Sequence, residues 1–147
     1  MNKRGEIILV EDDSDDADFF KQAYRELGIQ NKLTIFSNGK MAYDYFNNTD
    51  KNLFIIICDI NMPVMSGIEL RDKMQQVGEW RLRAIPFLFL TTGIAEDHLI
   101  NAYANSIQGF FLKPDSYAEL KIKLKNIIDY WMGNTEPVFY PKQLQEN

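Results

Sequence analysis

The sequence predicts an α/β protein, built as a doubly wound (βα)5 parallel sheet with helices on both faces. Five short apolar runs rich in β-branched and aromatic residues recur along the chain, and segments with helical spacing separate them. Strands that alternate with helices in this way form parallel sheets. A closed barrel of eight such units needs about 250 residues, so the length of 147 residues favours an open sheet of five strands.

Each predicted strand is an apolar run of four to six residues. The first, third and fourth runs show little polar alternation, which is typical of strands buried on both faces of a parallel sheet. We expect strands at Glu6–Val10, Leu33–Phe36, Leu53–Cys58, Phe87–Leu90 and Gly109–Leu112.

The first helix is predicted to begin at Ser14, whose hydroxyl is a good cap, and to end at Gly28. Acidic residues in its first turn suit the positive end of the helix dipole. These acids are Asp15, Asp16 and Asp18, and the expected apolar face is Ala17, Phe20, Tyr24 and Leu27.

Four further segments show helical spacing. We expect the second helix to begin at Ser37 or Asn38 and end near Phe46, the third to begin at Ser66, the fourth to run from about Glu96 to Asn105, and the last from about Ser116 to Trp131.

The charge balance argues against a broad nucleic-acid surface. Sixteen Lys and Arg stand against 21 Asp and Glu, which gives a net charge of −5, whereas binding to nucleic-acid phosphates needs clustered basic residues. The longest apolar runs, Leu53–Cys58 and Ala84–Leu90, fall far short of the ~20 residues that span a bilayer. We therefore expect neither a nucleic acid nor a membrane as a partner.

The chain has one cysteine, Cys58, and one histidine, His98. A single cysteine excludes an intramolecular disulfide and every CxxC motif, and a single histidine excludes multi-histidine metal sites. The N-terminal segment also lacks the apolar stretch of a signal peptide. We therefore expect a reducing, cytoplasmic setting.

Polar residues follow four of the predicted strands. In an open parallel sheet the ligand site lies outside the carboxyl ends of the strands. With the strand order 2-1-3-4-5, these ends bring together Glu11-Asp12-Asp13 after the first strand, Asp59 after the third, Thr91-Thr92 after the fourth and Lys113-Pro114 after the fifth.

Glu11, Asp12 and Asp59 would then crowd into one pocket. Like charges so close push a carboxyl pKa above its ordinary ~3.9 unless a cation compensates. Oxygen ligands alone select a hard ion such as Mg²⁺. Thr91 and Lys113 would add a hydroxyl donor and a positive charge, which suit a phosphoryl oxygen.

The acidic run from Glu11 to Asp18 also has a plainer interpretation. Acids at a helix start commonly solvate that end and stabilise the dipole. This explains Asp15, Asp16 and Asp18 well, but it explains Glu11 and Asp12 poorly because these two directly follow a buried strand.

Four segments resemble the receiver domains of two-component response regulators, of which the chemotaxis regulator is the simplest member. The resemblance covers residues from about 5 to 131 and implies a flavodoxin-like sheet. It rests on the order and spacing of Ile7-Ile8-Leu9-Val10-Glu11-Asp12-Asp13, Cys58-Asp59-Ile60-Asn61-Met62-Pro63 with Ser66-Gly67, Pro86 to Thr91, and Gly109-Phe110-Phe111-Leu112-Lys113-Pro114.

The resemblance implies a role for each matching acid. Asp59 would accept a phosphoryl group from a phosphohistidine on a sensor histidine kinase or a histidine phosphotransfer protein. Asp12 would hold Mg²⁺ directly and Glu11 through water, while Asn61 would lend its main-chain carbonyl. The protein would promote its own phosphorylation and dephosphorylation and would have no separate substrate.

The resemblance also implies a switch. The hydroxyl of Thr91 would turn toward the phosphoryl group, Lys113 would pair with a phosphoryl oxygen, and the Lys113–Pro114 peptide bond would be cis. Thr91 and Phe110 would carry the signal to the surface formed by the fourth helix, fifth strand and last helix. Phe110 stands where many relatives have Tyr, so only burial of its ring can report the state. Thr92 stands where the family usually has Ala, Gly or Ser, and its extra bulk would restrict water or a partner near the phosphate.

We expect a receiver domain over residues 1–131 and a C-terminal arm over residues 132–147, with no output domain. Such a receiver signals by contact with a downstream protein. The arm has two prolines and no helical period, which is typical of a free end, but it also contains Val138, Phe139, Tyr140 and Leu144, which favour docking on this chain or on a partner; both alternatives stay open. The arm and a long connection after the third helix are similar to those of single-domain regulators paired with phytochrome-type kinases, so a homodimer is possible.

Two other functions remain open from the sequence. An aspartyl-nucleophile phosphatase uses a related sheet, but such enzymes carry a second acid two residues after the nucleophile, where this chain has Asn61. A flavodoxin-like cofactor module needs a loop after the first strand that accepts phosphate. The loop here is Glu-Asp-Asp-Ser-Asp-Asp, which repels phosphate unless a metal is bound.

Overall fold

The computed structural model describes residues 1–48, 52–76, 84–93, 96–104 and 106–135. Within these residues, five parallel strands form one sheet in the order β2-β1-β3-β4-β5, as predicted. Each strand lies within one residue of its expected bounds. The strands are β1 (Glu6–Val10), β2 (Leu33–Phe36), β3 (Leu53–Cys58), β4 (Phe87–Thr91) and β5 (Gly109–Leu112).

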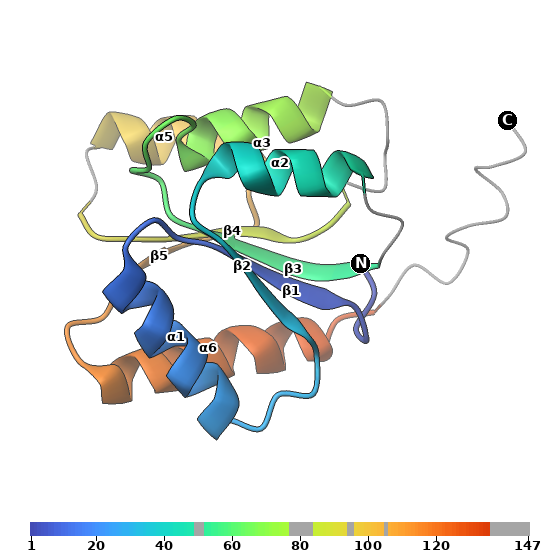
Figure 1. Cartoon of the computed structure of the whole chain (residues 1–147), viewed down its shortest axis with the longest axis vertical. Coiled ribbons are helices and arrows are strands. Elements are labelled where there is room, and N and C mark those ends of the chain that lie inside the picture. The colour runs from blue at the N-terminus through green and yellow to red at the C-terminus, as the bar shows by residue number, and fades with distance from the viewer. Residues whose placement is uncertain (49–51, 77–83, 94–95, 105, 136–147) are drawn as a thin grey trace, which may run out of the picture.

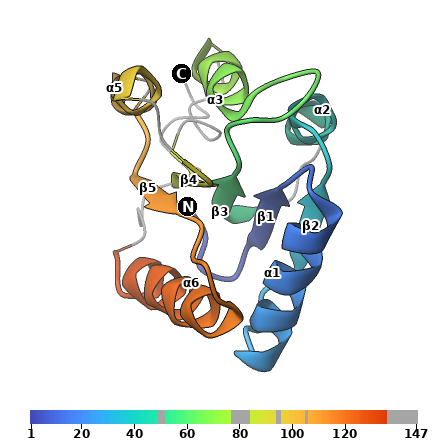
Figure 2. The same cartoon turned by 90° about the vertical axis from the view of Figure 1, so that its left-hand side faces the viewer.

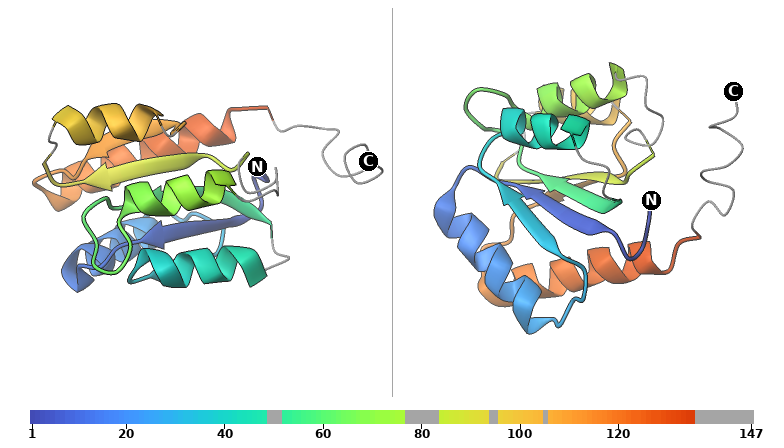
Figure 3. Two further views of the ribbon diagram at one scale, coloured as in Figure 1. Left: turned by 90° about the horizontal axis from the view of Figure 1, so that it is seen from above. Right: turned by 45° about the vertical axis from the view of Figure 1, so that its right-hand side comes forward.

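Helices cover both faces of the sheet (Figure 1, Figure 2). One face carries α1 (Ser14–Glu26) and α6 (Tyr117–Met132), and the other carries α2 (Gly39–Asn48), α3 (Gly67–Gln76) and α5 (Glu96–Ala104). Seen from above in Figure 3, α5, α3 and α2 lie side by side across their face. The predicted end of the fourth helix at Asn105, the long connection before β4 and the apolar residues of the C-terminal arm lie outside the described residues.

Two apolar layers form because successive side chains of a strand point to opposite faces. Ile8 and Ile56 belong to the layer that packs with Leu70 of α3. Ile7 and Ile57 belong to the layer on the other face, which packs with α1 and α6. The three central strands β1, β3 and β4 are buried along their whole length, whereas the edge strands β2 and β5 are mostly half-buried. The three buried strands are the first, third and fourth apolar runs, which were predicted to be buried because they show little polar alternation.

The cap of α1 differs from the prediction. Asp13, and not Ser14, is the capping residue, and its carboxylate accepts hydrogen bonds from the amide N–H groups of Asp15 and Asp16 at 2.9 and 3.0 Å. The prediction was wrong because Asp13 already has an extended backbone with its carboxylate within reach of those amides. Ser116 does cap α6, since its hydroxyl accepts from the amide of Glu119 at 3.2 Å.

No helix in the described part of the chain combines the length and the apolar character that crossing a membrane requires.

Candidate functional site

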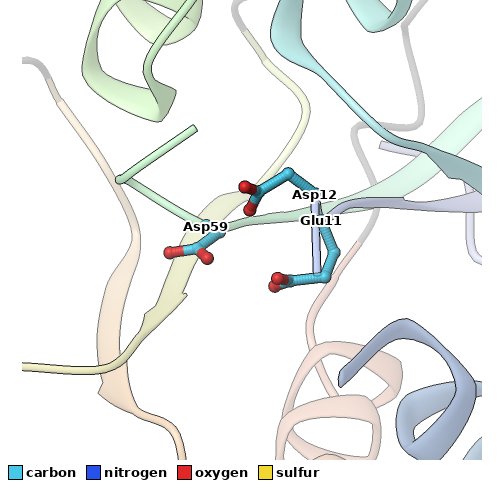
Figure 4. A group of neighbouring side chains, drawn as sticks. All are labelled: Glu11, Asp12 and Asp59. Atoms are coloured by element: carbon cyan, nitrogen blue, oxygen red, sulfur yellow. The ribbon is translucent and has the colours of Figure 1, made fainter. Parts of the chain in front are cut away.

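The candidate site lies where the carboxyl ends of the central strands meet. In the register between β1 and β3, Val10 is the partner of Cys58, so Glu11 and Asp59 leave the sheet side by side. Glu11 and Asp59 are 4% and 6% exposed, whereas Asp12 is exposed to solvent. Figure 4 shows these three side chains gathered at this end of the sheet. The structure therefore brings together the three acids that the strand order predicts to share one pocket.

These three carboxylates fit a divalent cation. One oxygen from each of Glu11, Asp12 and Asp59 lies within 4.8 Å of the others, and an all-oxygen donor set suits a hard ion. Burial raises the pKa of Glu11 to about 7; a hydrogen bond with Lys113 opposes this shift, and the charge of Asp59 adds to it. The raised pKa therefore reflects mainly the removal of this carboxylate from water, and only in smaller part the nearby charge of Asp59.

The carboxylate of Asp59 is held in a fixed orientation. Its Oδ1 accepts hydrogen bonds from the hydroxyl of Thr91 at 2.8 Å and from the amide N–H of Ile60 at 2.7 Å. Gly67 lies against its backbone, since a Cβ built on Gly67 would fall 2.1 Å from the Asp59 carbonyl oxygen. Asp59 is therefore fixed from both its side chain and its main chain.

Lys113 supplies the positive charge of the site. Its Nζ lies 2.9 Å from Glu11 Oε2, 2.8 Å from Asp16 Oδ2 and 3.1 Å from Asp59 Oδ2. Burial alone lowers the pKa of Lys113, but its contacts with Asp16, Glu11 and Asp59 outweigh burial and raise that pKa well above its usual range. The ammonium group therefore stays charged.

The expected cis peptide bond before Pro114 is wrong, because no peptide bond among the described residues is cis. Lys113 reaches the acids with a trans bond at this position. The amide N–H of Lys113 donates to the carbonyl of Thr91 at 2.8 Å, and the three carboxylates hold the side-chain ammonium. These contacts are sufficient to aim the side chain into the site.

Asp16 belongs to the site although the sequence assigns it only to the helix start. Helix-dipole chemistry explains an acid in the first turn of α1, so nothing in the local composition singles out Asp16 from Asp15. A positional signal does exist, because Asp16 lies four residues before Phe20, on the predicted apolar face. Phe20 is buried, and an acid one turn before it therefore lies toward the sheet.

The two predicted switch residues lie on neighbouring strands. Thr91 is fully buried and its hydroxyl already faces Asp59. The ring of Phe110 is half-buried, 5.9 Å from the ring of Phe89 in an edge contact and 6.5 Å from the stacked ring of Tyr103 on α5. Phe111 packs instead against the apolar layer on the α1 and α6 side, as its predicted core role requires.

Asn61 follows Asp59 in an exposed position in the β3–α3 loop. The loop turns back on itself, since the amide of Gly67 donates to the carbonyl of Ile60 at 2.9 Å and the amide of Met65 to the carbonyl of Pro63 at 2.8 Å. Thr92, next to Thr91, is also exposed.

Comparison with known proteins gives one consistent result. The family model of the response regulator receiver domain matches residues 7–125. The chain is 32% identical over 131 residues to the probable methanogenesis regulatory protein FilR2 of Methanothrix harundinacea, covering 86% of this chain and 83% of that protein. It is 30% identical over 129 residues to chemotaxis protein CheY-3 of Vibrio cholerae, covering 88% of this chain and 95% of that protein.

Among solved structures, the Mn²⁺-bound form of response regulator Rcp1 matches with a TM-score of 0.74 and 26% identity, covering 90% of this chain and 97% of that chain. The fold, the acidic pocket and the sequence match agree with one another. This chain belongs to the response regulator receiver domain family of two-component signalling.

Proposed function

We propose that this chain is a receiver in a phosphorelay, which accepts a phosphoryl group on Asp59 and signals by contact with another protein. The observation that carries the proposal is the setting of Asp59, a buried carboxylate between an acidic pair and a lysine. Phosphoryl transfer needs positioning and charge neutralisation more than covalent chemistry from the protein. The residues around Asp59 supply both.

Glu11, Asp12 and Asp59, with the main-chain carbonyl of Asn61, are the residues we assign to a Mg²⁺ ion. When bound, this ion neutralises charge on the phosphoryl oxygens and on the carboxylates. The closeness of the carboxylate oxygens and the oxygen-only donor set support this assignment. As the resemblance to receiver domains implies, Asp12 would hold the ion directly and Glu11 would hold it through water.

In the proposed step, a carboxylate oxygen of Asp59 attacks the phosphorus of a phosphohistidine. The new O–P bond forms as the P–N bond breaks, and the electron pair of the broken bond returns to the imidazole nitrogen, which then takes up a proton from solvent. Lys113 stabilises the transferred charge, since its ammonium already contacts Asp59 Oδ2. The Thr91 hydroxyl keeps the carboxylate in place for the attack.

We assign the outgoing signal to Thr91 and Phe110. A phosphoryl group on Asp59 would compete for the Thr91 hydroxyl and move the end of β4. Phe110 lies on β5, paired in register with Phe89 of β4, and its ring is stacked with the ring of Tyr103 on α5 at a centroid distance of 6.5 Å. A small movement at Asp59 would therefore reach a surface formed by α5, β5 and α6, where a downstream protein can bind.

We assign the receiver to residues 1–131 and propose that it works in the cytoplasm. The donor would be a sensor histidine kinase or a histidine phosphotransfer protein. The chain would have no separate substrate, because Asn61 stands where an aspartyl phosphatase carries its second acid.

Light scattering with and without beryllium fluoride tests whether activation produces a homodimer.

Incubation with acetyl phosphate and Mg²⁺, followed by intact-mass measurement, tests the proposal. We expect the mass to rise by one phosphoryl group in a Mg²⁺-dependent manner. Asp59→Asn should show no gain, while Asp15→Asn, which removes an exposed acid from the first turn of α1, should behave as the unaltered chain. An equal gain in Asp59→Asn would overturn the proposal.

A further inference from the structure

We propose that Asp16 is a positioning residue that holds the Lys113 ammonium in the site while Glu11 and Asp59 bind a divalent cation. This inference rests on the proposed function, since it takes Glu11 and Asp59 as cation ligands. It gives the carboxylate of Asp16 a role beyond stabilising the start of α1.

The contacts of Lys113 are the first step. A lysine ammonium has three N–H donors, and three carboxylate oxygens lie within 3.1 Å of this one. The shortest of the three contacts, 2.8 Å, is with Asp16. Asp16 therefore contacts the ammonium at least as closely as Glu11 and Asp59 do.

Asp16 differs from the other two partners in what else it can bind. Glu11 and Asp59 belong to the oxygen cluster that fits a cation, together with Asp12. When a cation binds these oxygens, their ion pairs with Lys113 weaken, because the cation and the ammonium compete for the same carboxylates. Asp16 is the partner of Lys113 that lies outside this cluster, so its contact with the ammonium can persist.

The helix fixes Asp16 where this contact needs it. The carboxylate of Asp13 accepts from the amide of Asp16 at 3.0 Å, and Phe20, one turn later, is buried against the sheet. The side chain of Asp16 is 40% exposed, compared with 3% for Glu11. A partly hydrated carboxylate on a fixed helix turn can keep its ion pair without the cost of burying a further charge.

Without the Asp16 carboxylate, Lys113 would have only the two acids that the cation also needs. Mg²⁺ would then have to displace an ammonium that has no other partner. We therefore expect Asp16→Asn to weaken Mg²⁺ binding about five-fold, which is within the usual coupling range for contacting charges.

Titration calorimetry with MgCl₂ on the full chain measures this effect. Asp15→Asn is the matched control, because Asp15 lies on the same helical turn, is exposed and carries the same charge. Screening by salt makes the loss of an exposed charge outside the site small, so we expect less than about a two-fold change in this control. Asp16→Glu, which keeps the carboxylate, should recover part of the lost affinity.

Repeating the measurement in the Lys113→Gln protein shows whether Asp16 affects Mg²⁺ binding through Lys113 or through the direct effect of its own charge on the cation. In Lys113→Gln, the Asp16→Asn change should weaken Mg²⁺ binding no more than Asp15→Asn does, because the ammonium is gone. If Asp16→Asn has the same effect with and without Lys113, or if it matches Asp15→Asn in the unaltered background, the proposal is overturned.

Urea unfolding of the metal-free proteins gives a readout that needs no cation. The double-mutant cycle of Asp16→Asn and Lys113→Gln should show a stabilising coupling between the two residues, and zero coupling would contradict the contact. If the unaltered chain takes up no Mg²⁺, the proposed function fails. Normal Mg²⁺ binding with equal weakening in Asp16→Asn and Asp15→Asn removes only the role of Asp16.

Discussion

Competition between protons and Mg²⁺ for Glu11 gives a quantitative test of the site. Burial raises the pKa of Glu11 to about 7 in the metal-free protein, with Lys113 opposing the shift and Asp59 adding to it. A cation binds the ionised carboxylate, so each proton bound must leave first. The apparent Mg²⁺ affinity should fall about ten-fold per pH unit below pH 7 and become level above it.

The magnitude follows from a single competing proton. Between pH 8 and pH 5, with a pKa of about 7, the loss of affinity amounts to about 100-fold. The same pKa affects stability without metal. Because the pKa of Glu11 in the folded protein lies above its ordinary value of 4.5, the protonated carboxyl adds to the free energy of unfolding. This contribution is fully present below pH 4.5 and is lost as the pH rises through 7. The loss is about 3 kcal/mol at most.

Calorimetric titration with MgCl₂ at pH 5, 6, 7 and 8 measures the affinity, and urea unfolding without metal measures the stability. Glu11→Gln is the matched variant, because it keeps the size of the side chain but cannot ionise. It should bind Mg²⁺ more weakly at pH 8 and show a flat pH dependence down to pH 6. An unchanged slope in Glu11→Gln, or an affinity of the unaltered chain that does not vary between pH 5 and 7, would refute this reasoning.

Three further substitutions test how the site is supported. Gly67→Ala places a Cβ 2.1 Å from the Asp59 carbonyl oxygen and should lower both Tm and Mg²⁺ affinity, whereas Gly133→Ala, whose nearest atoms lie at 3.5 Å, should change neither. Arg71 is 1% exposed and donates from Nη2 to the Ser106 carbonyl at 2.8 Å, so Arg71→Ala should cost about 3 kcal/mol in urea unfolding; a cost under about 1 kcal/mol would show that this buried arginine is dispensable. Thr91→Val removes the hydroxyl that donates to Asp59 Oδ1 and should cost about 1 kcal/mol without metal; unaltered stability would speak against that hydrogen bond.

The strands could be predicted because the central strands are buried on both faces and therefore read as unbroken apolar runs, whereas their order was taken from the flavodoxin-like fold class. The predicted site residues Glu11, Asp59 and Lys113 each directly follow a strand, so the sheet order alone places them together. Asp12 was predicted for the same reason, and the structure finds it in the same cluster.

The remaining features depend on contacts between distant parts of the chain. Asp16 meets Lys113 across 97 residues of sequence; its spacing from Phe20 places it toward the sheet, but nothing local identifies Lys113 as its partner. Arg71 would ordinarily be placed on the surface, yet it is buried between α3 and the turn before β5, with its guanidinium 5.2 Å over the Phe87 ring. Local composition does not determine either contact, because each depends on how a helix packs on the sheet.

Chemical trapping at residue 59 tests the central claim most directly. After incubation with acetyl phosphate and Mg²⁺, borohydride reduces an acyl phosphate on a carboxyl group to an alcohol, which peptide mass mapping then locates. The account predicts homoserine at position 59 in the unaltered chain, and none there when the donor or Mg²⁺ is left out. Reduction at another acid, such as Asp12, with Asp59 unmodified would contradict it.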